Sequence, residues 1–189
     1  EWARHYHLDL KDKTLGVIGA GPIGQRVMQL GKGIGMNVIG WTLHPSSDRA
    51  RDYGVDFVNL DDLLIRSDVL AVCIALSERT KNLIGRREFG MMKPGAIIVN
   101  TARGLVVDET AMVEALSLGK IAGAGLDVFA DEPLLANSPL RELNNVILSP
   151  HVAAATFEGT MERLWVAIDN IKRFIKGDLA NAIIHGFRV

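Results

Sequence analysis

The feature that most constrains the fold is a glycine pattern placed between an apolar run and a helical pattern. Residues 15–18 form the apolar run, and a G-x-G-x-x-G pattern follows at Gly19, Gly21 and Gly24. In this context the first glycine allows a tight turn, the second lets the main chain approach a pyrophosphate, and the third allows close helix packing. Pro22 is compatible with an early helical position, because its missing N–H is one that has no partner within the helix. The pattern predicts a dinucleotide site; the alternative is a tight turn without a ligand.

Short apolar runs alternate with helical patterns along the chain, which indicates repeated βαβ units. The sequence therefore predicts an α/β fold, a Rossmann-type doubly wound parallel sheet in three layers. A last helical pattern carries an apolar stripe that is expected to pack in a core or against another subunit. Expected strands are 14–18, 37–41, 69–75, 96–100, 123–126 and 146–148, and expected helices are 23–31, 60–67, 87–91, 108–118 and 156–176.

Composition indicates a globular protein that needs no covalent or metal support. Hydrophobic residues make up 48% and charged residues 23% of the 189 residues, which suits one ordinary domain. We expect a leader at 1–9, the dinucleotide-binding domain at 10–176 and a tail at 177–189. The single cysteine, Cys73, excludes an internal disulfide and a cysteine-rich metal cluster, and it favours a cytoplasmic location.

Charge and hydropathy narrow the class of partner. The chain has 21 Lys and Arg against 22 Asp and Glu, a net charge of -1, so it lacks the basic field that nucleic-acid binding requires. No apolar run approaches the roughly 18 residues of a membrane span. The expected partner is therefore a small molecule, and neither nucleic acid nor a membrane.

The residues that would contact the adenosine ribose do not settle the choice between NAD and NADP. An acidic residue is expected after the second strand, but Thr42 stands there. Thr42 can hydrogen-bond a ribose hydroxyl. Because no carboxylate stands there, a 2′-phosphate would not be repelled by a like charge. Arg49 and Arg51 follow, either as phosphate contacts or as solvated surface charges. Both cofactors stay open, with NAD slightly favoured.

Three polar residues follow expected strands, on the edge of the sheet where α/β proteins bind ligands. Arg103 can hold a substrate carboxylate and polarise a carbonyl. A carboxylate such as Glu132 raises the pKa of a histidine that it binds and orients the ring, which makes His151 a usable acid and base. Singly, each residue is more often a surface residue. Their shared edge makes hydride transfer the favoured chemistry.

Over residues 10–177 the chain resembles the nucleotide-binding domain of the D-isomer-specific 2-hydroxyacid dehydrogenases. The order of the matching motifs is more specific than any one of them. The matching segments are 15–24 (LGVIGAGPIG), 92–96 (MKPGA), 100–104 (NTARG), 107–109 (VDE), 123–129 (GAGLDVF), 132–133 (EP) and 149–153 (SPHVA).

The resemblance implies that a 2-oxo acid is reduced reversibly to a D-2-hydroxy acid. It implies that Arg103 binds the substrate carboxylate and carbonyl, that His151 transfers the proton and that Glu132 pairs with His151. Asp127 is expected at the nicotinamide amide. The segment at 75–77 departs from the usual Pro-Leu-Thr of the cofactor wall. The full set of expected cofactor contacts is Gly19, Gly21, Pro22, Ile23, Gly24, Thr42, Ala75, Leu76, Ser77, Thr101, Ala102, Arg103, Asp127, His151 and Ala153.

Most of the family's substrate domain precedes the glycine loop, and here only residues 1–9 precede the domain. The resemblance therefore implies a chain that binds cofactor but turns over poorly or not at all, and that forms a homodimer through this domain. Two other functions stay open. One is an NAD(H)-sensing module like the transcriptional corepressors that share this fold, and the other is a phosphite-oxidising relative.

Overall fold

The computed structural model describes residues 9–178, and the chain divides into two units after His151. The first unit spans residues 1–151 and the second spans 152–189. The division lies inside the 10–176 range that the sequence assigned to one domain. Each unit is described by itself below.

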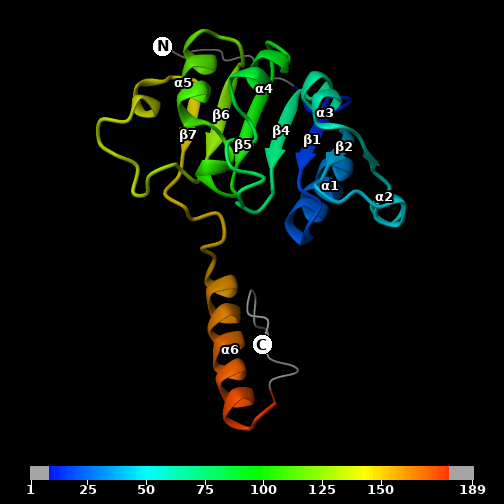
Figure 1. The fold of residues 1–189 in the computed structure, drawn as a ribbon, viewed down its shortest axis with the longest axis vertical. Coiled ribbons are helices and arrows are strands. Elements are labelled where there is room, and N and C mark those ends of the chain that lie inside the picture. The colour runs from blue at the N-terminus through cyan, green and yellow to red at the C-terminus, as the bar shows by residue number, and fades with distance from the viewer. Residues whose placement is uncertain (1–8, 179–189) are drawn as a thin grey trace. The chain divides into compact units, whose positions relative to one another are not determined.

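The first unit is built on a parallel sheet in the order β3-β2-β1-β4-β5-β6-β7 (Figure 1). Every neighbouring pair runs parallel. Chain order reverses between β1 and β4, which makes this the position where open α/β sheets bind ligands. The α/β doubly wound fold is thus confirmed. The strands are β1 Thr14–Ile18, β2 Asn37–Trp41, β3 Asp56–Phe57, β4 Val69–Val72, β5 Ile97–Asn100, β6 Gly123–Leu126 and β7 Val146–Leu148.

Helices cover both faces of the sheet because strand side chains alternate between them. Leu15 and Val17 of β1 pack in a cluster with Met28 of α1 (Pro22–Gly33), whereas Ile18 packs in a second cluster with Leu63. α1 contacts α2 (Ser47–Tyr53), and α3 (Leu60–Arg66), α4 (Arg86–Met91) and α5 (Glu109–Ser117) contact one another in succession.

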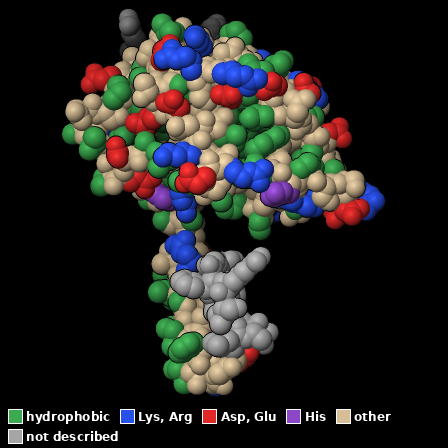
Figure 2. All heavy atoms as spheres, viewed as in Figure 1, with side chains coloured by type: hydrophobic (Ala, Val, Ile, Leu, Met, Phe, Trp, Pro, Cys, Tyr) green, Lys and Arg blue, Asp and Glu red, His purple; other side chains and the backbone are tan. Residues whose placement is uncertain are grey.

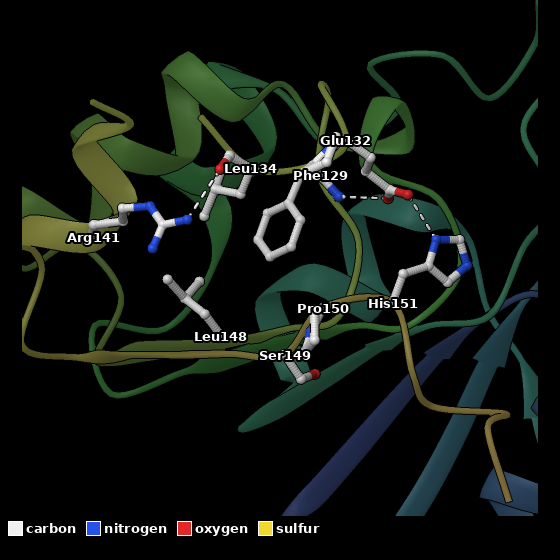
Figure 3. Close-up of a pocket in the computed structure, with 9 residues that line it drawn as sticks. Phe129, Glu132, Leu134, Arg141, Leu148, Ser149, Pro150 and His151 are labelled. Atoms are coloured by element: carbon white, nitrogen blue, oxygen red, sulfur yellow. Dashed lines mark hydrogen bonds and ion pairs between the residues drawn. The ribbon is translucent and has the colours of Figure 1, made fainter. Parts of the chain in front are cut away.

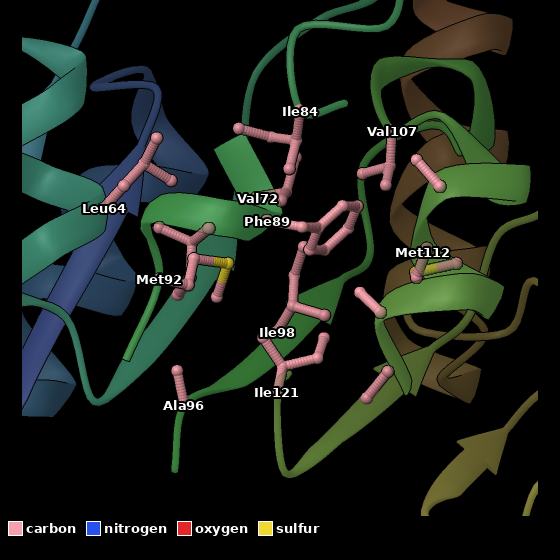
Figure 4. Close-up of a cluster of buried hydrophobic side chains, with 14 of the residues drawn as sticks. Leu64, Val72, Ile84, Phe89, Met92, Ala96, Ile98, Val107, Met112 and Ile121 are labelled. Atoms are coloured by element: carbon pink, nitrogen blue, oxygen red, sulfur yellow. The ribbon is translucent and has the colours of Figure 1, made fainter. Parts of the chain in front are cut away.

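The larger cluster lies between the sheet and α3, α4 and α5 (Figure 4). Phe89 of α4 is 1% exposed and packs among Ile84, Ile98 and Met112. Burial of each such side chain stabilises the fold by about 1.5–3 kcal/mol. This core fixes the carboxyl ends of the central strands, where the polar residues of interest follow.

The structure differs from the prediction at the end of one strand, and it contains elements that the sequence did not predict. The strand expected at 69–75 ends at Val72, because the turn at Gly19 packs against the main chain of Cys73. The sequence missed α2 and β3, and also two short 3-10 helices, Gly104–Val106 and Pro139–Glu142. Asp108 caps α5 as expected, with its carboxylate accepting the Ala111 N–H at 3.1 Å.

The second unit contains α6, Phe157–Ile175, which Thr156 caps by accepting the Gly159 N–H at 3.0 Å. Gly177 follows in a left-handed conformation with φ of 74°. None of the α6 residues is buried, and Trp165 and Ile175 of the apolar stripe are 61% and 76% exposed. The stripe therefore does not form a core within this unit.

Candidate active site

The glycine loop joins β1 to α1 and packs tightly against the end of β4. Gly19 has φ of 102°, a conformation that favours glycine. A Cβ at Gly24 would lie 1.9 Å from the Gly19 carbonyl oxygen, whereas a Cβ at Gly21 would meet nothing within 4 Å. Gly21 is the N-cap of α1 and offers no side-chain hydrogen bond. The first N–H groups of α1 are therefore open to an anion.

A cavity of about 670 Å³ opens over this loop at the carboxyl edge of the sheet. Its size is typical of small-molecule sites. The open main chain at Gly21 leaves the close approach that a pyrophosphate requires, so the residues present fit a dinucleotide. The lining comes from the segments that follow four strands and from the helices α1 and α2: Gly19, Ala20, Gly21, Pro22, Ile23, Thr42, Leu43, His44, Arg49, Cys73, Ile74, Ala75, Leu76, Thr101, Ala102 and Arg103.

Asn100 shapes the loop that carries Arg103. Its side chain is 1% exposed at the end of β5. Its Oδ1 accepts the Ala102 N–H at 3.0 Å, and its Nδ2 donates to the Arg103 carbonyl at 3.0 Å. A Cβ at Gly104 would lie 1.9 Å from the carbonyl carbon of Phe129, so this loop packs directly on the segment that leads to Glu132.

Glu132 and His151 form a hydrogen-bonded pair, with His151 Nδ1 2.7 Å from Glu132 Oε2 (Figure 3). The other oxygen of Glu132 accepts the Phe129 N–H at 3.1 Å. The His151 N–H donates to the Asp127 carbonyl at 2.8 Å, and His151 has φ of 55°, uncommon for a residue with a side chain. The turn after β7 thus directs the imidazole toward Glu132.

The surroundings of Glu132 favour its ionised form. The hydrogen bond with His151 and then the Phe129 N–H lower the pKa of Glu132 below 4.5, and the charge of Arg103 acts in the same direction. The side chains of His151 and Glu132 are 48% and 36% exposed. A carboxylate beside a half-exposed imidazole is an arrangement suited to acid and base chemistry.

Asp127 lies at the end of β6, where it is 3% exposed. Ser149 Oγ donates to Asp127 Oδ1 at 2.5 Å, and the Asp127 N–H donates to the Asn100 carbonyl at 3.0 Å. These contacts tie the ends of β5, β6 and β7 together. They hold the segment before His151 against the segment after Asn100.

A second cavity, of about 630 Å³, lies beside the Glu132 and His151 pair (Figure 3). Arg141 holds one wall by donating to the carbonyls of Leu134 and Leu135, at 3.0 Å each. The imidazole of His151 is one of the lining side chains. The others are Phe129, Glu132, Pro133, Leu134, Arg141, Leu148, Ser149 and Pro150.

The structure brings most of the expected residues together, but not all. Ser77, Asp127 and His151 lie outside the lining of the dinucleotide cavity, as does Gly24, which packs beneath the loop. Ala153 belongs to the second unit. Arg49, which the sequence left open as a phosphate contact or a surface charge, lines the cavity. The sequence did not predict five other lining residues, which are Ala20, Leu43, His44, Cys73 and Ile74.

Residues 9–178 offer neither a cluster of metal ligands nor a membrane-spanning helix. No group of three or more His, Cys, Asp or Glu side chains in that range could hold a metal ion. None of the helices there is long and apolar enough to cross a membrane. Acidic and basic side chains are interspersed on the visible face of the first unit (Figure 2).

Comparison with known proteins gives relatives over nearly the whole chain. The glyoxylate reductase of Aeropyrum pernix is 40% identical over 178 residues, 94% of this chain and 53% of the relative. The D-3-phosphoglycerate dehydrogenase of Methanocaldococcus jannaschii is 41% identical, over 98% of the length of this chain and 36% of the length of the relative. The chain therefore spans about half, or less, of the length of these curated relatives.

A solved structure is similar at the level of the fold. The D-lactate dehydrogenase of Aquifex aeolicus, complexed with NAD and lactic acid, superposes with a TM-score of 0.85 at 35% identity. The match covers 93% of this chain and 57% of that one. Residues 1–153 match the family described as D-isomer specific 2-hydroxyacid dehydrogenase, NAD binding domain. The chain belongs to the D-2-hydroxyacid dehydrogenase family, and residues 1–153 match its NAD-binding domain.

Proposed function

We propose that the protein carrying this domain reduces 2-oxo acids reversibly to D-2-hydroxy acids with a nicotinamide dinucleotide. The observation that carries the proposal is the 2.7 Å contact between His151 Nδ1 and Glu132 Oε2, at the sheet edge that also holds the dinucleotide cavity. The family to which the chain belongs supports the same reaction.

His151 is the proposed proton donor and acceptor. Because Nδ1 faces the carboxylate, the Nδ1–H group donates a hydrogen bond to Glu132. This leaves Nε2 to exchange a proton with the substrate oxygen. Glu132 keeps the ring in this orientation and stabilises its protonated form. In reduction, Nε2 gives its proton to the carbonyl oxygen as that oxygen becomes a hydroxyl; in oxidation it takes the proton back.

Arg103 is the proposed anchor for the substrate carboxylate. One of its Nη atoms donates to the Ala102 carbonyl at 2.6 Å, and a guanidinium has five N–H donors in all. The remaining donors suit a two-point contact with a carboxylate and an adjacent carbonyl. A positive charge there also stabilises the oxygen on which negative charge develops. A nicotinamide bound in this site would supply or accept the hydride.

The proposed cofactor contacts are the main chain of the glycine loop for the phosphates, Thr42 for the ribose and residues 75–77 and 101–103 for the wall. Asp127 is proposed at the nicotinamide amide, and Ala153 is proposed as a further cofactor contact. Gly24 acts beneath the loop, where its lack of a side chain allows the close approach to Gly19. We also propose a cytoplasmic protein that forms a homodimer through this domain.

An assay of the complete protein that contains this domain tests the reaction. A panel of 2-oxo acids, with phosphite as a separate arm, is mixed with NADH or NADPH (NAD or NADP for phosphite), and the absorbance of the reduced cofactor is followed. Consumption with at least one 2-oxo acid is expected. Tight cofactor binding without any consumption would favour a dinucleotide-sensing protein instead.

For the 189-residue chain alone, we propose cofactor binding with little or no turnover. The chain spans about half the length of the relatives, and the His151 side chain is 48% exposed, so these residues do not by themselves exclude water from the reacting atoms. Turnover by this chain at the rate of the complete protein would contradict the proposal.

A further inference from the structure

The charge of the dinucleotide cavity is one-sided. Arg49 and Arg103 both line it, together with His44, and none of its lining residues is an Asp or a Glu. An acidic side chain after β2 is the feature that binds a ribose 2′-hydroxyl and repels a 2′-phosphate. Thr42 occupies that place. The ribose end of the cavity is therefore open to an additional negative charge.

Arg49 is held at this end of the cavity by main-chain contacts. It lies in α2, yet its Nη2 donates to the Ala20 carbonyl within the glycine loop at 2.5 Å, and its Nη1 donates to the His44 carbonyl at 3.2 Å. Carbonyl oxygens orient a guanidinium without neutralising its charge. Tyr53 Oη also donates to the Ala20 carbonyl, at 3.4 Å. The positive charge is thus fixed between the phosphate loop and the segment after β2.

Arg51 lies two residues further along α2 and behaves differently. Its Nη2 lies 2.6 Å from Asp48 Oδ1, and the side chains of this pair are 75% and 74% exposed. Arg51 does not line the cavity. The structure therefore separates two arginines that the sequence treated alike, and only Arg49 is placed to contact a cofactor.

We propose that the ribose end of this cavity accepts a 2′-phosphate, with Arg49 as the specificity-determining contact and Thr42 beside it. The protein then binds NADP(H) as well as NAD(H). The inference rests on the cavity being the cofactor site, as in the proposed function, but it does not require turnover. A guanidinium suits this role because its planar donors match phosphate oxygens.

Calorimetric titration of the 189-residue chain with NADH and with NADPH tests the inference. NADPH is expected to bind no more than about tenfold more weakly than NADH, a gap of about 1.4 kcal/mol. Arg49→Gln keeps an amide N–H for the Ala20 carbonyl and removes the charge. It is expected to weaken NADPH binding by about tenfold or more, and NADH binding by less than about twofold.

Arg51→Gln is the matched control, because it removes the same charge from the same helix outside the cavity. It is expected to leave the affinities for both dinucleotides unchanged. Thr42→Asp provides an independent arm, since a carboxylate at the ribose should weaken NADPH selectively. The probe 2′,5′-ADP should follow NADPH in every variant, because it carries the 2′-phosphate but no nicotinamide.

Each outcome has a distinct meaning. NADH binding with NADPH more than about tenfold weaker would overturn the inference and leave the proposed function standing. Equal weakening of both dinucleotides by Arg49→Gln, or an equal effect of Arg51→Gln, would overturn the role of Arg49. Failure of both dinucleotides to bind the unaltered, folded chain would overturn the cofactor site itself.

Discussion

The buried amide of Asn100 holds the main chain of Arg103: its Nδ2 donates to the Arg103 carbonyl at 3.0 Å, while its Oδ1 accepts the Ala102 N–H. The loop that presents the guanidinium is therefore shaped by a side chain that faces away from solvent. Asn100 acts as a positioning residue, because it reaches the site only through the loop.

Replacement of this side chain should weaken both the fold and the site. Asn100→Ala leaves the Ala102 N–H and the Arg103 carbonyl without their partner, and we expect a loss of about 1–3 kcal/mol in the free energy of unfolding. Denaturant unfolding measures it. Asn37→Ala is the control, since Asn37 also donates to a main-chain carbonyl, that of Asp12, but is exposed. An equal loss in both variants would contradict the role of Asn100.

Two glycines of α1 should respond oppositely to alanine. A Cβ at Gly24 would lie 1.9 Å from the Gly19 carbonyl oxygen, so Gly24→Ala should cost about 1–3 kcal/mol of stability and weaken dinucleotide binding. A Cβ at Gly33 meets nothing within 4 Å, so Gly33→Ala should be neutral or stabilise by up to about 1 kcal/mol. Thermal melts with and without NADH measure both effects. Similar losses in the two variants would argue against the close packing at Gly24.

The Glu132 carboxylate should contribute a pH-dependent part of the stability. Its pKa in the folded chain is lowered, chiefly by His151, so its contribution is fully present above the ordinary value of about 4.5 and is lost as the pH falls below it. Glu132→Gln should therefore lower the melting temperature near neutral pH and have a shrinking effect in acid. In a His151→Asn background the same substitution should matter less. If Glu132→Gln lowered the melting temperature more in acid than near neutral pH, the lowered pKa of Glu132 would be contradicted.

Cys73 provides a chemical test of the cavity. Burial raises the pKa of its thiol from 9.0 to about 11, which reduces the thiolate fraction about a hundredfold near neutral pH. Alkylation by iodoacetamide should be slow in the folded chain and fast after denaturation. Because Cys73 lines the dinucleotide cavity, NADH should slow it further. Alkylation of the native thiol at the rate of a free cysteine would contradict this placement.

Loss of the imidazole should affect turnover more than binding. In the complete protein, His151→Asn should reduce kcat by about 10²–10⁴-fold, the range typical of a lost general acid or base. The affinity for NADH should change little, since His151 does not line the dinucleotide cavity. Fluorescence titration and steady-state kinetics separate the two quantities. A variant with normal kcat would exclude His151 as the proton donor.

The fold could be predicted largely from local pattern. The strand at 14–18 and the strand at 123–126 coincide with β1 and β6 because each is a short apolar run between clear turns. α2 was missed because none of its residues is buried, so it has no apolar periodicity to detect. The end of β4 was misplaced because the close approach of Gly19, 54 residues earlier in the chain, decides where the strand stops.

The candidate site was predictable where a functional side chain comes shortly after the end of a strand, as at Arg103 and His151. It was not predictable where a side chain acts over a long separation in sequence. The contact from Arg49 to the Ala20 carbonyl spans 29 residues and depends on the direction of α2. Asn100 belonged to a recognised motif, but its role depends on the turn conformation of Ala102 and Arg103, which residue types alone do not specify.

The reversal of strand order between β1 and β4 has a consequence for how the domain opens. The lining residues that follow β1 and β2 and those that follow β4 and β5 share one cavity but belong to opposite halves of the sheet. A dinucleotide that fills this cavity acts as a non-covalent cross-link between the two halves. Cofactor binding should therefore slow amide hydrogen exchange in β2 and β5 together, because separation of the halves then requires release of the ligand.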